Sequence, residues 1–169
     1  YFRYLGLKVQ NSGDSWGRFT ALKQYNYETL YKWFTLLDTL DNKSNYIASL
    51  AAYYYSQTQN SEDTIYVINY LRNHYKYDPV TKWWWLSQAT YIANHKFEDK
   101  DLALELAYEM HNLPSYIEMP LWARQMAAFI HEQKGEMDSA KQIIADILYH
   151  QKNFSTGELN FMEYFITDR

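Results

Sequence analysis

The sequence predicts an all-α protein built from short antiparallel helical hairpins. Apolar residues recur at three-to-four spacing along most of the chain, and no segment sustains the alternation of a β-strand. The breaks between the apolar stripes are short. Helices joined by loops of about two to eight residues must run antiparallel to their neighbours.

The composition restricts the classes of protein and of site. A chain of 169 residues is long enough for one domain with a sizeable core. No uncharged apolar run is long enough to span a bilayer, and the absence of cysteine excludes disulfides and thiolate metal sites. The net charge of −4 and the dispersed Lys and Arg residues argue against nucleic acid as a partner, because phosphate binding needs a basic stripe. The cellular compartment stays open.

Residues 1–26 are expected to form an irregular N-terminal arm. The stretch from Asn11 to Ser15 has turn chemistry, and glycines on either side of it weaken a helix. Because the chain opens on Tyr1 and not on Met, we expect a fragment or a processed form. Any targeting or membrane segment would then lie outside it. Residues 27–169 are expected to form one helical repeat domain.

Three helices are expected before residue 80, at about 27–40, 47–57 and 61–74. Leu30, Phe34 and Leu37 form the apolar stripe of the first, and a short break separates it from the second. Ser61 and the two acidic residues after it begin the third, since negative charge favours the first turn. Pro79 marks the end of this third helical segment, because proline disfavours helix in the residue before it.

Five further helices are expected at about 83–95, 100–112, 122–133, 137–148 and 157–166. A turn at residues 97–99 separates the first two, and Pro114 and Pro120 bracket the loop before the third. Gly135 closes that third helix. The fourth has a stripe of isoleucines at helical spacing, and the fifth is expected to be a capping helix.

The helical hairpins repeat along the chain. A small residue in the middle of each first helix and an aromatic residue at its start both recur at intervals of 37 and then 39 residues. The small residues are Ala52, Ala89 and Ala128, and the aromatic residues are Tyr46, Trp83 and Trp122. A small side chain at a helix crossing lets two backbones approach, and each hairpin then buries its remaining apolar face on the next.

This pattern resembles the tetratricopeptide repeat (TPR) family. In the hairpin that begins at Trp122, Ala128 stands at the small position of the first helix. Gly135 marks the turn, and Ala140 stands at the small position of the second helix. The preceding hairpin departs from the family pattern at Gln88, where a leucine is expected.

The resemblance covers roughly residues 44–152 and implies a short right-handed α-solenoid of three to four antiparallel helical hairpins (TPR-like). In such arrays the first helices line a concave surface, and their outward residues contact the ligand. The resemblance therefore implies an aromatic surface with an amide rim that binds a protein or peptide. The expected partner-binding residues are Tyr46, Tyr53, Gln57, Trp83, Thr90, Asn94, Trp122, Phe129 and Gln133.

An alternative interpretation places the tryptophans in the core. Trp83 and Trp122 would then pack over the preceding helix, while Trp84 and Trp85 would simply be buried. However, three consecutive tryptophans cannot all face inward on one helix. The aromatic content of 19 % therefore leaves room for a surface as well as a core.

No pattern of residues indicates chemistry. The five histidines are scattered, without the i, i+3 or i+4 pairing that often accompanies a metal site, and the acidic residues near 98–101 and 136–138 suit helix capping. We therefore expect no enzymatic activity, no catalytic or metal-binding residue and no cofactor. The predicted function is a non-catalytic interaction module or scaffold that binds a peptide or partner subunit on an aromatic concave surface.

A second interpretation is a structural subunit that is permanently buried in a larger assembly. Such an assembly could be tethered to a membrane only through a segment outside this chain.

Overall fold

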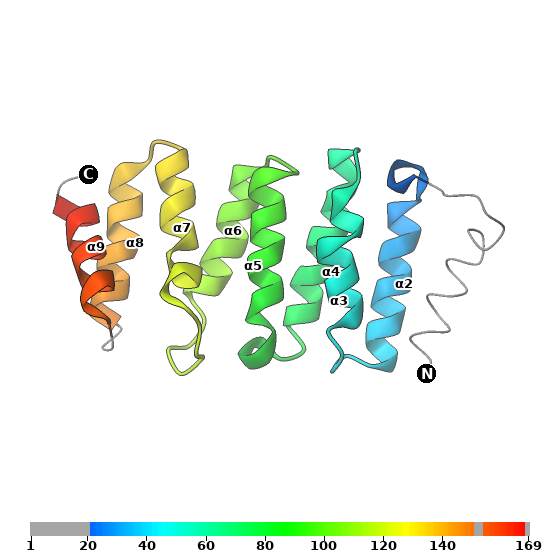
Figure 1. Cartoon of the computed structure of the whole chain (residues 1–169), viewed down its shortest axis with the longest axis horizontal. Helices are drawn as coiled ribbons and strands as arrows, with labels where there is room; N and C mark the ends of the chain where they lie inside the picture. Colours follow the sequence, from blue (N-terminus) through cyan, green and yellow to red (C-terminus); the bar gives the residue numbers. More distant parts are fainter. Residues whose placement is uncertain (1–20, 151–153, 168–169) are drawn as a thin grey trace.

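Eight α-helices succeed one another along the longest axis of the protein in a computed structural model that describes residues 21–150 and 154–167 (Figure 1). The part of the chain so described contains no strand. The helices, with the labels of Figure 1, are α2 (Tyr27–Leu40), α3 (Tyr46–Tyr53), α4 (Thr64–Tyr75), α5 (Pro79–His95), α6 (Lys100–His111), α7 (Leu121–Gln133), α8 (Met137–His150) and α9 (Thr156–Thr167).

Each helix packs against the next one in the chain, from α2 to α9. The two terminal helices of this series lie at opposite ends of the protein (Figure 1). The prediction of an all-α protein with sequentially packed helices is confirmed for the described residues.

Side chains also connect alternate helices. On one side α3, α5, α7 and α9 are linked in this way, and on the other α2, α4, α6 and α8 are linked. Representative pairs are Tyr53 with Trp84, Trp83 with Trp122, Phe129 with Phe161, Tyr70 with Asp38, Arg72 with Glu105, and His111 with Asp146. The eight helices therefore form two rows.

A single apolar core runs from α2 to α9 between these rows. Ala52, Ala89 and Ala128 are all buried in it, on α3, α5 and α7 respectively. Burial is what the expected role of these alanines at helix contacts requires.

Two helix bounds differ from the prediction by four residues each, and α4 begins at Thr64 and not at Ser61, because Ser61–Asp63 form a 3-10 turn before it. Helix α5 begins at Pro79 and not at Trp83. Proline has no backbone N–H group, but the first turn of a helix leaves this group unpaired in any case, so proline is accepted there. Helix α3 ends at Tyr53, and the chain continues as a 3-10 turn, Tyr55–Gln57. There the carbonyl oxygen of Tyr55 accepts a hydrogen bond of 2.7 Å from the hydroxyl of Tyr27, a tertiary contact that periodicity cannot reveal.

The expected ends of two other helices agree with the structure. The side chain of Asn26 caps α2 by accepting a hydrogen bond of 2.8 Å from the backbone N–H of Thr29. Gly135 follows α7 with a φ of 79°, the left-handed conformation that glycine adopts at the ends of helices. Of the predicted N-terminal arm, residues 1–20 lie outside the described residues, and Leu22–Gln24 form a 3-10 turn.

Candidate functional site

Aromatic side chains gather on the row formed by α3, α5 and α7. We use the name aromatic face for Tyr46, Tyr53, Trp83, Trp84, Trp122 and Phe129. Large apolar side chains are normally buried, yet Tyr53, Trp84 and Trp122 are 53 %, 38 % and 41 % exposed. This exposure makes the aromatic face the leading candidate for a binding surface.

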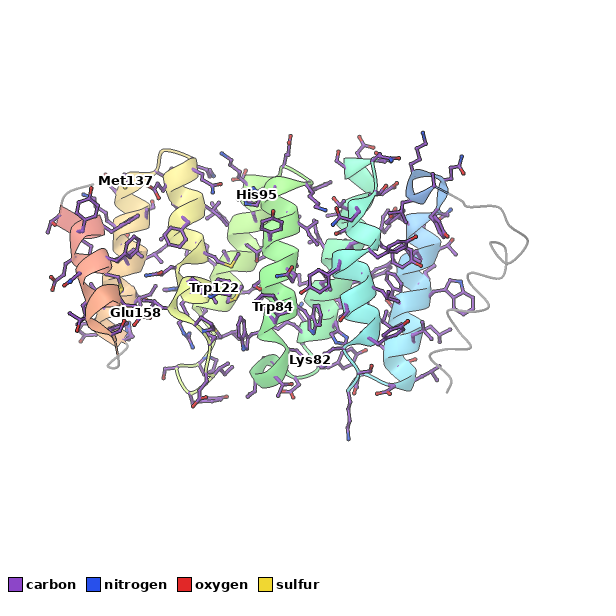
Figure 2. All side chains as sticks on the ribbon, viewed as in Figure 1. Lys82, Trp84, His95, Trp122, Met137 and Glu158 are labelled. Carbon is purple, nitrogen blue, oxygen red and sulfur yellow. The ribbon has the colours of Figure 1, made fainter. Side chains whose placement is uncertain are left out.

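The central part of the aromatic face is connected by direct contacts. The indole N–H of Trp84 donates a hydrogen bond of 2.8 Å to the hydroxyl of Tyr53, which joins α5 to α3. The rings of Trp83, Trp84 and Trp122 contact one another with centroids 5.9 to 6.1 Å apart, which joins α5 to α7. Figure 2 shows Trp84 and Trp122 as neighbours between these two helices. The contacts hold the rings in defined positions.

The helical period explains why adjacent tryptophans have different surroundings. Successive residues on a helix point about 100° apart, so Trp84 and Trp85 cannot share one environment. Trp85 is 6 % exposed, and its indole N–H donates a hydrogen bond of 3.0 Å to Oδ1 of Asn45. The alternative interpretation, in which Trp84 and Trp85 both lie in the core, is therefore correct for Trp85 and wrong for Trp84.

The nine predicted partner-binding residues differ in their exposure. Tyr46, Tyr53, Gln57, Trp122 and Gln133 are exposed, and Trp83, Asn94 and Phe129 are half-buried. Thr90 is fully buried, and its hydroxyl donates a hydrogen bond of 2.9 Å to the carbonyl of Leu86. Thr90 therefore lies beneath the surface that it was expected to line.

Two pairs of predicted residues are brought together. Trp83 meets Trp122 with ring centroids 6.1 Å apart. The side-chain amide of Asn94 donates a hydrogen bond of 2.9 Å to Oε1 of Gln133. In each pair the two residues lie 39 positions apart in the sequence, one on α5 and the other on α7.

A cavity of about 190 Å³ opens between α5 and α7. Its lining includes Tyr91, Asn94, His95, Met126, Phe129 and Gln133. No lysine, arginine, aspartate or glutamate lines it. It is a mainly apolar recess beside the aromatic face, and Phe129 belongs to both.

A second group of polar residues is buried between α2, α4 and α5. Nδ1 of His74 lies 2.6 Å from Oδ2 of Asp38, and the hydroxyl of Tyr70 donates a 2.9 Å hydrogen bond to the other oxygen of that carboxylate. The ammonium of Lys82 donates to Oδ1 of Asn45 and lies 2.9 Å from Nε2 of His74. We call Asp38, Tyr70, His74 and Lys82 the buried polar cluster, since all four are buried, whereas Asn45, the residue before α3, is exposed.

The contacts of the buried polar cluster define the state of its imidazole. Because an ammonium can only donate, Nε2 of His74 accepts from Lys82, and Nδ1–H donates to Asp38. Burial lowers the pKa of Lys82, and the charge of Asp38 partly offsets this effect. His74 is 0 % and Lys82 4 % exposed, and the contacts of the cluster connect α2, α4 and α5.

His131 and Asp99 also make structural contacts. Nδ1 of His131 lies 2.6 Å from Glu136, and the side chain of Asp99 accepts hydrogen bonds from two backbone N–H groups at the start of α6. The capping role expected of the first acidic cluster is confirmed for Asp99. Across residues 21–150 and 154–167, no three His, Asp or Glu side chains are arranged to hold a metal ion. No helix in those ranges has the length and apolar character needed to cross a membrane.

Sequence reasoning missed several residues of this region. Trp84 was assigned to the core in one interpretation and omitted from the other, although the rule that three consecutive tryptophans diverge could have identified it. Tyr91, His95 and Met126 carry no repeat signal, because they enter the cavity only through the way α5 and α7 pack.

Comparisons of the chain with protein families, with curated proteins and with solved structures found no match. The resemblance to tetratricopeptide repeats therefore rests on the residues of this chain alone.

Proposed function

We propose that this chain is a short right-handed α-solenoid of the tetratricopeptide type that binds a protein or peptide partner without catalysing a reaction. Three features support the solenoid. The helices form two rows, alternate helices touch, and Ala52, Ala89 and Ala128 are buried on successive helices of one row. Stacked two-helix units that contact only their neighbours produce this arrangement.

The proposal of partner binding rests on Trp83, Trp84 and Trp122, which are partly exposed and contact one another. Trp and Tyr side chains dominate the energetics of interfaces, because they bury a large apolar area and lose few rotamers on binding. Trp84 and Trp122 are already held by ring contacts before any partner arrives. Their ordering therefore costs little at the moment of binding.

The chemistry of the aromatic face indicates the kind of partner. The face contains no charged residue, and the protein as a whole carries a net charge of −4. Aromatic side chains supply no positive charge for phosphate groups. An apolar or aromatic segment of a protein suits it better than a nucleic acid does.

The experiment that tests this function is affinity capture from the source organism, followed by mass spectrometry. Trp84→Ala and Trp122→Ala should each abolish the capture of a partner that the unaltered chain retains, while far-UV circular dichroism stays unchanged. Tyr149→Ala is the matched control, because this aromatic side chain is 83 % exposed on α8, in the other row. Equal capture by all four proteins would contradict the proposal.

A second candidate function is that of a structural subunit buried permanently in a larger assembly. The terminal helix α9 favours it, since Leu159, Phe161 and Tyr164 are 36 %, 38 % and 52 % exposed. Sedimentation velocity separates the two candidates. A transient binder should remain monomeric alone, whereas an obligate subunit should self-associate through these side chains.

A further inference from the structure

The helices of the row α3, α5, α7 and α9 bury their positive charges. Helix α3 contains no charged residue, and the only lysine or arginine residues in the other three helices are Lys82 and Arg124. They are 4 % and 5 % exposed. Lys82 belongs to the buried polar cluster, and the guanidinium of Arg124 donates to backbone carbonyl groups of the loop before α7. No helix of this row therefore presents a lysine or an arginine to a partner.

The accessible charges of the same four helices, histidine apart, are negative. Glu132 and Glu158 are half-buried, and Glu163 is exposed. By contrast, the helices of the other row present both signs of charge, for example in the ion pair of Lys32 with Glu28 on α2. The row that carries the aromatic face is therefore complementary to a cation, as is a protein with a net charge of −4.

The exposed indole rings of the aromatic face also favour a cation. The face of an aromatic ring carries partial negative charge, and tryptophan is the aromatic side chain that attracts cations most strongly. Trp84 and Trp122 are 38 % and 41 % exposed, and their rings meet at an angle of 87° with centroids 6.0 Å apart. Two rings at right angles form a corner in which one cation can contact both ring faces.

Hydrogen-bond acceptors beside these rings indicate which cation fits. The hydroxyl of Tyr53 accepts from the indole N–H of Trp84 at 2.8 Å, and a hydroxyl oxygen can accept a second hydrogen bond. Gln88 follows Trp84 by one helical turn, on the same side of α5. Its half-buried amide makes no hydrogen bond to any other residue that the structure describes. A planar guanidinium can stack on a ring and still donate from its edge, whereas the compact ammonium of lysine cannot stack.

We propose that the aromatic face binds an arginine side chain of the partner, whose guanidinium packs against the rings of Trp84 and Trp122, beside the acceptors of Tyr53 and Gln88. This inference rests on the proposed function and specifies the chemistry of the partner, which is an apolar segment that carries an arginine. An acidic segment would instead be repelled by the carboxylates of the same row.

Two peptides blocked at both ends test the inference, Gly-Leu-Arg-Leu-Gly and the same peptide with citrulline in place of arginine. Citrulline retains the length and the planar end of arginine but is uncharged. Each peptide is titrated into the isotope-labelled full chain in about 0.5 M sodium chloride, which screens the attraction exerted by the net charge. NMR follows the indole N–H resonances of Trp84 and Trp122, which are assigned through Trp84→Phe and Trp122→Phe.

The arginine peptide should shift both indole resonances saturably. The citrulline peptide should bind at least about fivefold more weakly, because an uncharged group makes no cation–π contact. Equal binding of the two peptides to the unaltered protein, or no shift of either resonance, would overturn the inference.

Substitutions by leucine connect the preference to the two rings, because leucine is apolar but has no aromatic face. In the double variant Trp84→Leu/Trp122→Leu, the two peptides should bind with equal affinity, followed at the indole of Trp83, whose ring contacts both replaced rings. Far-UV circular dichroism verifies that the double variant is folded, and each single variant serves if it is not. Tyr149→Leu is the matched control, since this exposed tyrosine lies on α8, and it should keep the full preference. A preference for arginine that survives the loss of both rings would also contradict the inference.

The same measurements separate this inference from the proposed function. If the two peptides bind equally while Trp84→Ala and Trp122→Ala still abolish partner capture, only the assignment of an arginine is lost. If the preference for arginine is observed while those variants capture the partner normally, the aromatic face binds a guanidinium but is not the surface that holds the partner.

Discussion

Trp84 and Trp122 meet edge to face between α5 and α7, with ring centroids 6.0 Å apart and ring planes at 87°. Trp85, the residue after Trp84, lies in the core and is hydrogen-bonded to Asn45. Two adjacent tryptophans of one helix thus have opposite roles. Trp84 presents its ring at the surface, while Trp85 contributes to the folding of the domain.

This contrast predicts unequal losses of stability for two neighbouring substitutions. Trp85→Ala should reduce the free energy of unfolding by about 3–5 kcal/mol, because it empties a buried site. Trp84→Ala should cost about 1 kcal/mol, because it removes ring contacts at the surface. Urea denaturation followed by circular dichroism measures both. Equal losses would mean that Trp84 also belongs to the core.

The buried position of Ala128 leads to a prediction about helix packing. Ala128→Leu should destabilise the protein by about 1–3 kcal/mol, because the added carbons must enter a filled space between helices. Gln142→Leu is the control, since Gln142 is exposed on α8 and leucine is a good helix former. A thermal melt in which both variants match the unaltered protein would refute the proposed repeat contact.

The buried polar cluster predicts non-additive substitutions. Asp38→Ala should cost about 3–5 kcal/mol, because it leaves a buried cation without its compensating charge. Lys82→Met removes that cation and should therefore cost less in the Asp38→Ala background than in the unaltered protein. A double-mutant cycle should yield a coupling of about 0.5–3 kcal/mol, and strict additivity would show that the two residues act independently.

The buried tyrosines predict a loss of stability at alkaline pH. Burial raises the pKa of Tyr27 and of Tyr75 from the ordinary 10.0 to about 12 in each case. The folded state thus holds these protons more firmly than the unfolded state does. Their contribution is complete below pH 10 and is lost as the pH rises towards 12.

The free energy of unfolding, measured in urea across this pH range, checks the prediction. Tyr27→Phe and Tyr75→Phe should each flatten the decline, whereas Tyr149→Phe, at an 83 % exposed position, should leave it unchanged. Lys82 changes the free energy of unfolding with pH in the opposite direction. Because its pKa is lowered on folding, its contribution makes stability rise as the pH approaches the ordinary value of 10.5. Measurements in the Lys82→Met background remove this opposing effect.

Much of the fold was accessible from the sequence because helix formation is read from neighbouring residues. The stripe of Leu30, Phe34 and Leu37 correctly predicted α2, with both ends as observed. Pro79 was placed correctly as the residue that separates two helices, but its ability to begin the second one was overlooked. That error arose because proline, which has a fixed φ and no backbone N–H group, can both end one helix and start the next.

The candidate site was only partly accessible. Trp122 and Tyr53 were expected at the surface and are exposed, but Thr90, chosen by the same repeat interval, is buried. A repeat interval locates a residue on its helix without specifying how far the helix is rotated towards its neighbours. Exposure depends on that rotation, which follows from the packing of large side chains from several helices.

The sequence by itself determined the all-helical class, the order of the helices and the position of most of their ends, because these depend on local periodicity, capping and proline. Only the tertiary structure decided which tryptophan is buried, which side chains line the cavity and how the buried polar cluster forms. His74 and Asp38 are 36 residues apart in the chain and meet within 2.6 Å. No local pattern specifies such a contact, because it depends on how separate helices are rotated and packed against one another.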